Sequence, residues 1–206
     1  MRTRLAVMLG VACLAPALSA AQELPGKSDA VAQWVALNEG PLQEQLFPIA
    51  AAPGEVRANE YVRCRVVGTG GQGPVLYELA DYGRGRVVLK TRTLAAPDWA
   101  TAVVAVAPGK IPRDVGAVAA RIDVAETERE GKDCPELFAL VAQIDTLRLP
   151  ATAPYFTAHP GTLVACQFQS LGLTSVRVSV AILDADEPWK PFLDWVKRLS
   201  SACPKK

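Results

Sequence analysis

The chain is 206 residues long, half of its residues are apolar, and its formal net charge is +1 at pH 7. A chain with this apolar content is not of the disordered class, and its length suits one ordinary domain. The near-neutral charge predicts no general attraction to nucleic acid or anionic lipid.

The N-terminus has the pattern of a secretory signal peptide. Arg2 and Arg4 form a basic start, residues 5–14 are an apolar run, and residues 19–21 are small. The apolar run is too short to span a bilayer, and no later segment reaches the required length without charge or proline. We therefore expect residues 1–21 to be removed during export.

Cleavage after Ala21 leaves a mature protein over residues 22–206 with 20 basic and 21 acidic side chains, since Arg2 and Arg4 are lost. The alternative is lipid attachment at Cys13, which would anchor the chain to a membrane surface. The sequence predicts a periplasmic or secreted protein of the bacterial envelope.

Four cysteines remain after cleavage, an even number for an oxidising compartment: Cys64, Cys134, Cys166 and Cys203. Two disulfides are the simplest interpretation, and three pairings are open. Cys64 and Cys166 lie in strand-like runs while the other two flank helices, which favours Cys64 with Cys166 and Cys134 with Cys203. A metal site is not expected, because no Cys-x-x-Cys spacing occurs and His159 is the single histidine.

The first predicted element of the mature chain is an amphipathic helix over residues 28–40. Ser28 and Asp29 are typical capping residues, and apolar side chains then recur at helical spacing. Gly40 predicts the end of this helix. Residues 42–47 add a separate helical turn.

Strand patterns follow. Residues 60–67 alternate and are rich in β-branched side chains. Residues 75–80 and 86–93 flank a turn at 81–85, which predicts a hairpin.

The next segment is less regular. Residues 102–107 and 121–125 are predicted as short strands, and residues 115–120 fit a helix or a strand. The acid-rich stretch 126–133 is predicted as a solvated loop, because its neighbours are polar.

The last third returns to clear periodicity. A helix is predicted after Asp133, with one apolar face and an end before Pro150. Strands follow at 163–168 and 176–183. An amphipathic helix over residues 188–202 closes the chain.

Together these elements predict a single α+β domain over residues 22–206. Its core is a mainly antiparallel sheet with helices packed on one face, and with helices near both ends of the chain.

Motifs for catalysis or cofactor binding are weak. Gly68, Gly70 and Gly73 match a dinucleotide-binding fingerprint, but a strand and not a helix follows them, so we interpret them as a hairpin loop. His159 precedes a proline on a turn and lacks a nucleophile motif nearby. We expect no cofactor. Glu78 with Asp81 is the best acid pair for a carboxylate-based hydrolase of envelope polymers, which is the alternative function.

A basic surface interleaved with tyrosines is the more informative pattern, because arginine and tyrosine are enriched at protein interfaces. The candidate partner-binding residues are Arg63, Arg65, Tyr82, Arg84, Arg86 and Arg92. An ordinary solvated sheet face is the competing interpretation. The main functional hypothesis is a non-catalytic module, of inhibitor or immunity type, that binds another protein in the envelope or extracellular space. A structural accessory of an envelope complex is a further alternative.

Overall fold

The structure is a computed structural model that describes residues 27–51, 58–68, 73–147, 162–170, 176–182 and 189–203. The predicted signal peptide, Cys13 and His159 lie outside the described residues.

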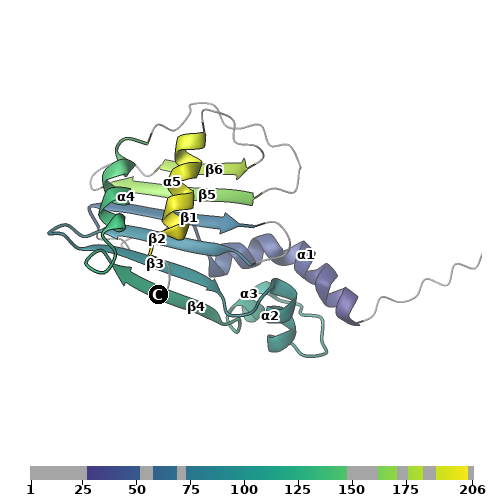
Figure 1. The fold of residues 1–206 in the computed structure, drawn as a ribbon. Coiled ribbons are helices and arrows are strands. Elements are labelled where there is room, and N and C mark those ends of the chain that lie inside the picture. The colour runs from purple at the N-terminus through teal and green to yellow at the C-terminus, as the bar shows by residue number, and fades with distance from the viewer. Residues whose placement is uncertain are drawn as a thin grey trace, which may run out of the picture.

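Six strands form one sheet in the order β4-β3-β2-β1-β5-β6, and every neighbouring pair is antiparallel (Figure 1). The strands are β1 (Glu60–Val67), β2 (Val75–Asp81), β3 (Val87–Leu94), β4 (Val124–Glu130), β5 (Thr162–Ser170) and β6 (Val176–Ile182). The predicted α+β fold with an antiparallel sheet is confirmed.

Five helices accompany the sheet in the described part of the chain. They are α1 (Lys27–Leu46), α2 (Trp99–Val106), α3 (Val115–Ala119), α4 (Glu136–Ile144) and α5 (Lys190–Ser201). Helices α4 and α5 pack on one face of the sheet, as expected, while α1, α2 and α3 gather at one end (Figure 1). Within the described ranges, no helix has the length and apolar content needed to cross a membrane.

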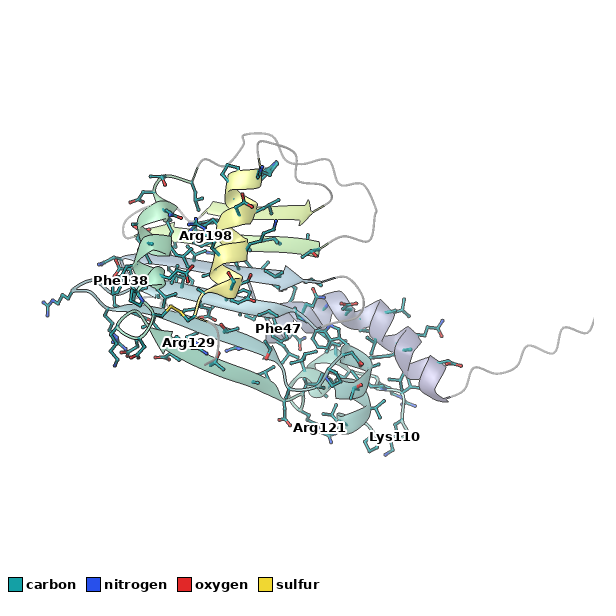
Figure 2. All side chains as sticks on the ribbon, viewed as in Figure 1. Phe47, Lys110, Arg121, Arg129, Phe138 and Arg198 are labelled. Atoms are coloured by element: carbon teal, nitrogen blue, oxygen red, sulfur yellow. A yellow bond between two sulfur atoms is a disulfide. The ribbon has the colours of Figure 1, made fainter. Side chains whose placement is uncertain are left out.

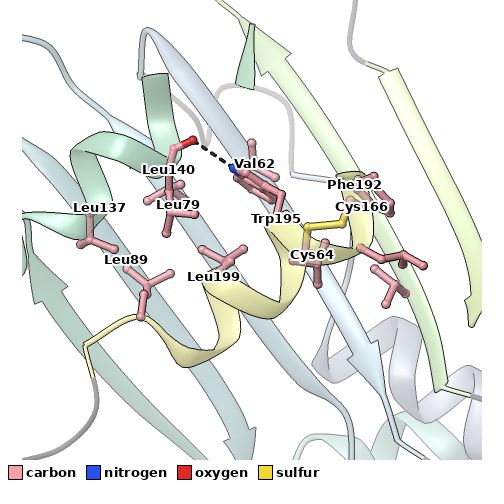
Figure 3. Packing of buried hydrophobic residues seen from close by; sticks show 14 of the residues in the cluster. Val62, Cys64, Leu79, Leu89, Leu137, Leu140, Cys166, Phe192, Trp195 and Leu199 are labelled. Atoms are coloured by element: carbon pink, nitrogen blue, oxygen red, sulfur yellow. Dashed lines mark hydrogen bonds between the residues drawn. A yellow bond between two sulfur atoms is a disulfide. The ribbon is translucent and has the colours of Figure 1, made fainter. Parts of the chain in front are cut away.

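The main core lies between the sheet and helices α4 and α5 (Figure 3). Side-chain alternation along β1 places Val62 on this face, and α5 contributes Phe192 and Leu199. Trp195 is fully buried, and its indole N–H donates to the carbonyl of Leu140 at 3.0 Å. Because a buried polar group needs a partner, this bond fixes α5 against α4.

Two disulfides hold this core together, in the pairing that the sequence favoured. Cys64 and Cys166 stand directly opposite each other on β1 and β5 and are bonded. Cys134, just before α4, is bonded to Cys203, just after α5. The two bonds fit a protein of an oxidising compartment.

A second apolar cluster joins the sheet to α1, α2 and α3. Phe47, directly after α1, is fully buried and meets the ring of Trp99 edge-on, with 6.1 Å between the centroids. Leu76 and Leu94 bring β2 and β3 into this cluster. Leu76 faces away from Leu79 of the main core, so this helical group covers part of the opposite sheet face.

The strand predicted at residues 102–107 is wrong, because this segment forms α2. The carboxylate of Asp98 accepts a hydrogen bond from the Thr101 backbone N–H at 2.7 Å, which caps the helix. The helix then buries Trp99 and Val103 on one face. Capping and one-sided burial outweigh the strand preference of a valine-rich run.

Residues 115–120, which fitted either state, contain the short helix α3. Asp114 caps it as Asp98 caps α2, since its carboxylate accepts from the Ala117 backbone N–H at 2.7 Å. Aspartate is among the preferred capping residues, which explains why both helices begin where they do.

The strand predicted at 121–125 and the loop predicted at 126–133 are both displaced, because β4 runs from Val124 to Glu130. This edge strand pairs with β3 along its whole length. Its acids are compensated across the ladder, as in the ion pair of Arg92 with Glu126 at 2.6 Å. The polar composition therefore marks a charged edge strand, which discourages further strand pairing.

The predicted helix end at Gly40 is also wrong, since α1 continues through Pro41 to Leu46. Proline removes one helical hydrogen bond and disfavours the helix interior. Beyond it, however, Leu42 and Phe47 are fully buried. We attribute the continued helix to this apolar burial, which exceeds the local cost of the proline.

Candidate protein-binding surface

The turn between β2 and β3, residues 82–86, is called the hairpin tip below. The predicted turn is confirmed. The backbone N–H of Tyr82 donates to the carbonyl of Arg86 at 2.9 Å, and that of Arg86 donates to the carbonyl of Gly83 at 3.0 Å. The Asp81 carboxylate accepts from the Gly83 N–H at 2.8 Å. Three hydrogen bonds thus hold the backbone of the tip in one conformation.

Three successive residues of the tip have left-handed backbone conformations. The φ angles are +75° at Gly83, +55° at Arg84 and +75° at Gly85. Glycine takes this region freely, but a long side chain such as that of Arg84 does so rarely. A Cβ at Gly83 would lie 2.7 Å from the side-chain nitrogen of Asn59, which would have to move, and the positive φ would strain any other residue there. Strained non-glycine residues of this kind concentrate at functional sites.

The side chains of the tip point to solvent. Tyr82 is 42% exposed, and the guanidinium of Arg86 lies over its ring, 5.1 Å from the centroid. Such a contact contributes about 0.5–1 kcal/mol at an exposed site. Arg84 is exposed as well. In the described part of the chain, no carboxylate forms an ion pair with either arginine.

A charged pair lies beside the tip at the end of β4. The Nζ of Lys132 lies 2.6 Å from the carboxylate of Glu130. The hydrogen bond from Lys132 lowers the pKa of Glu130, and the same bond raises the pKa of Lys132. The positive charge of Arg86 also lowers the pKa of Glu130. The pair lies near the tip, because Glu130 stands opposite Val88 on β3 and the Gly131 N–H donates to the carbonyl of Val87.

Arg63 and Arg65, both predicted at the partner-binding surface, are instead buried, with 3% and 7% of their surface exposed. Arg63 donates to the carbonyls of Pro48 and Ala50 at 3.4 and 3.2 Å. Arg65 donates to the carbonyl of Phe47 at 3.2 Å. These arginines satisfy the carbonyls that follow α1, and their burial removes them from any contact surface.

Arg92 has a mixed environment. It donates to the carbonyl of Leu46 at 3.2 Å and to the carboxylate of Glu126 at 2.7 Å. The neighbouring Lys90 forms an ion pair with Glu128 at 3.5 Å. Arg92 therefore lies away from the hairpin tip, where it joins the end of α1 to the sheet.

Glu78 and Asp81, the acids considered for hydrolysis, are not brought together. They are three residues apart in one strand, so their side chains point to opposite faces of the sheet. Glu78 is paired with Arg63 at 3.1 Å and accepts from the Tyr61 hydroxyl at 3.3 Å. A hollow of about 230 Å³ beside it is lined by charged residues of both signs from β3 and β4. Glu78 is thus engaged with Arg63 and Tyr61 beside a charged hollow and does not lie in an apolar pocket.

The three tyrosines of the predicted basic surface also differ in exposure. Tyr61 is buried under the guanidinium of Arg63, 5.5 Å from its ring centroid. Tyr77 packs against the main core, and burial raises the pKa of its hydroxyl. Only Tyr82 among the three is at the exposed tip.

The glycine run connects two antiparallel neighbours, β1 and β2, as expected for a hairpin loop. Gly68 and Gly73 are described, whereas Gly70 lies outside the described residues. Within the described ranges, no group of three potential metal ligands comes together.

No protein-family model matches this chain, and neither the curated proteins nor the solved structures contain a significant match. The function is therefore inferred from the site itself.

Proposed function

We propose that this chain is a non-catalytic binding protein of the bacterial periplasm or extracellular space, which recognises another protein through the hairpin tip. The most concrete form is an inhibitor or immunity-type protein that blocks an envelope-directed toxin or hydrolase. The observation that carries the proposal is the conformation of the tip, in which Tyr82, Arg84 and Arg86 are exposed on a backbone held by hydrogen bonds.

The physical basis is preorganisation. Binding normally costs about 0.5–1.5 kcal/mol for each flexible side chain that becomes ordered. The contact between Arg86 and the ring of Tyr82 orders two of these side chains before a partner arrives. Tyrosine and arginine are also the residue types that contribute most at interface hot spots.

The position of the tip supports the same function. It projects from the end of β2 and β3, two inner strands of the sheet, so a rigid scaffold supports it (Figure 1). The Cys64–Cys166 disulfide joins β1, the next strand, to β5. Inhibitors commonly present a contact loop on such a scaffold, because a rigid loop changes little on binding.

The test is affinity capture with charge-reversed variants. Mature protein, residues 22–206, is immobilised and exposed to bacterial envelope and culture-fluid extracts, beside Arg84→Glu/Arg86→Glu. Lys190→Glu/Lys197→Glu is the control, since it changes the net charge equally at exposed residues of α5. We expect a protein that the wild type and the control retain and the tip variant loses. A set of bound proteins that is identical for all three would refute the proposal.

A further inference from the structure

A second surface lies at the opposite end of the sheet, where α2 and α3 enclose a shallow groove of about 640 Å³. The strand β3 begins at the hairpin tip and ends at Leu94, shortly before α2, so the length of a strand separates the two surfaces. The groove is therefore independent of the tip. Its size falls in the range of ordinary ligand and peptide sites.

The floor of the groove is apolar. Val106 at the end of α2 and Val118 of α3 line it, and Ile111 stands between the helices with 56% of its surface exposed. An isolated exposed aliphatic side chain needs no explanation, but one in the wall of an apolar groove marks a contact site. The connection that carries Ile111 turns at Gly109, whose φ angle is +69°.

Three cations also line the groove: Lys110, Arg113 and Arg121. All three are exposed, and within the described part of the chain no ion pair involves them. Figure 2 shows Lys110 and Arg121 at the α2–α3 end of the molecule. The single acid in the lining, Asp114, is already engaged as the cap of α3. The groove thus has a surplus of positive charge in a protein whose total charge is close to zero.

Sequence reasoning missed this group because its residues are spread over a connection and two short helices. The strands predicted at 102–107 and 121–125 gave no reason for Lys110 and Arg121 to lie in one groove. Only the helical hairpin of α2 and α3 brings them to one groove.

We propose that the α2–α3 groove binds an acidic peptide segment of a partner protein, with its apolar side chains on Val106 and Val118 and its carboxylates on the three cations. Charge complementarity argues for this occupant, because three separate cations in the lining match several carboxylates better than one anionic head group. The concave shape suits a peptide chain, whereas a membrane surface would be met by protruding side chains.

The test uses a short fluorescein-labelled peptide that alternates glutamate with leucine, titrated with the full mature protein and followed by fluorescence anisotropy. We expect saturable binding that weakens about tenfold in Lys110→Glu/Arg121→Glu and a few-fold in Ile111→Ser. The matched control is Arg84→Glu/Arg86→Glu, which changes the net charge equally at the hairpin tip and leaves the peptide affinity unchanged. Unaltered urea unfolding of each variant confirms that the fold is intact.

Three results overturn the proposal. The first is absence of binding to the wild type, and the second is an equal loss in both charge-reversed variants, which indicates non-specific attraction. The third is binding to phosphatidylglycerol vesicles that depends on Lys110 and Arg121 while the peptide does not bind, which assigns the groove to a lipid surface. None of these results bears on the hairpin tip, so the two proposals fail separately.

Discussion

Replacing Arg65 with leucine tests whether this buried arginine stabilises the fold or instead serves to bind a partner protein. Its guanidinium donates to the Phe47 carbonyl at 3.2 Å and pairs with Glu44 at 2.6 Å. Glu44 is 62% exposed, so the ion pair contributes at most about 1 kcal/mol. A buried carbonyl left without a donor costs about 1–3 kcal/mol. We expect Arg65→Leu to lower the free energy of unfolding by about 2–3 kcal/mol.

Urea unfolding followed by tryptophan fluorescence measures this change, because Trp99 lies in the cluster that α1 packs against. Glu44→Ala removes the ion pair alone and should cost less than about 1 kcal/mol. Arg84→Ala, at an exposed position, should change stability by less than about 0.5 kcal/mol. If Arg65→Leu lowers the free energy of unfolding no more than Arg84→Ala does, Arg65 does not stabilise the end of α1 as described.

Three further predictions address the helix cap, the disulfides and the strained tip. Asp98→Ala should cost about 1 kcal/mol at neutral pH. The Thr101 N–H holds the pKa of Asp98 below its ordinary value, so this stabilisation is complete above the unfolded-state pKa and is lost as the pH falls through the folded-state pKa. Unfolding of both proteins at pH 7 and in acid checks this, and a pH-independent difference would contradict it. Replacing Cys64 and Cys166, or Cys134 and Cys203, by alanine pairs should lower stability by up to about 4–5 kcal/mol each. The sequence separations of 102 and 69 residues give nearly equal chain entropies, and a loss confined to one pair in thermal melts would exclude this account. Arg84→Gly should leave stability unchanged within about 1 kcal/mol, because relief of the left-handed strain offsets the added chain entropy. It should nevertheless weaken partner binding, and calorimetry with the captured partner decides the point.

The strands other than β4 were predictable because their side chains alternate. Residues 60–67 place apolar and polar groups on opposite faces, and this two-residue period is specific to strands. The same period placed Cys64 and Cys166 on apolar faces, which made their pairing the favoured one.

The segments that sequence reasoning misplaced are those whose state depends on distant contacts. Residues 102–107 are rich in valine and alanine, and besides the Asp98 cap it is the burial of Trp99 and Val103 that favours a helix there. Residues 126–133 were predicted as a loop, because the cations that pair with Glu126 and Glu128 come from β3, far away in the sequence.

In the candidate site, too, local features were predictable and features that depend on distant segments were not. The local turn signal at 81–85 placed the hairpin tip correctly. The alternation of side chains in residues 60–67 assigned Arg63 and Arg65 to the polar face of the strand. It could not show that the segment following α1 covers that face. The hydrophobic pattern of one strand cannot predict that a segment distant in the sequence will bury its polar side chains.

The central claim, that the hairpin tip recognises a protein, is tested most directly by the affinity of the captured partner for Tyr82→Ala and Arg86→Ala. Hot-spot residues of these types cost about 2 kcal/mol or more when truncated, which is roughly a thirtyfold loss of affinity. We predict such a loss for at least one variant, with unfolding in urea unchanged. Affinities equal to that of the wild type in both variants would contradict the claim.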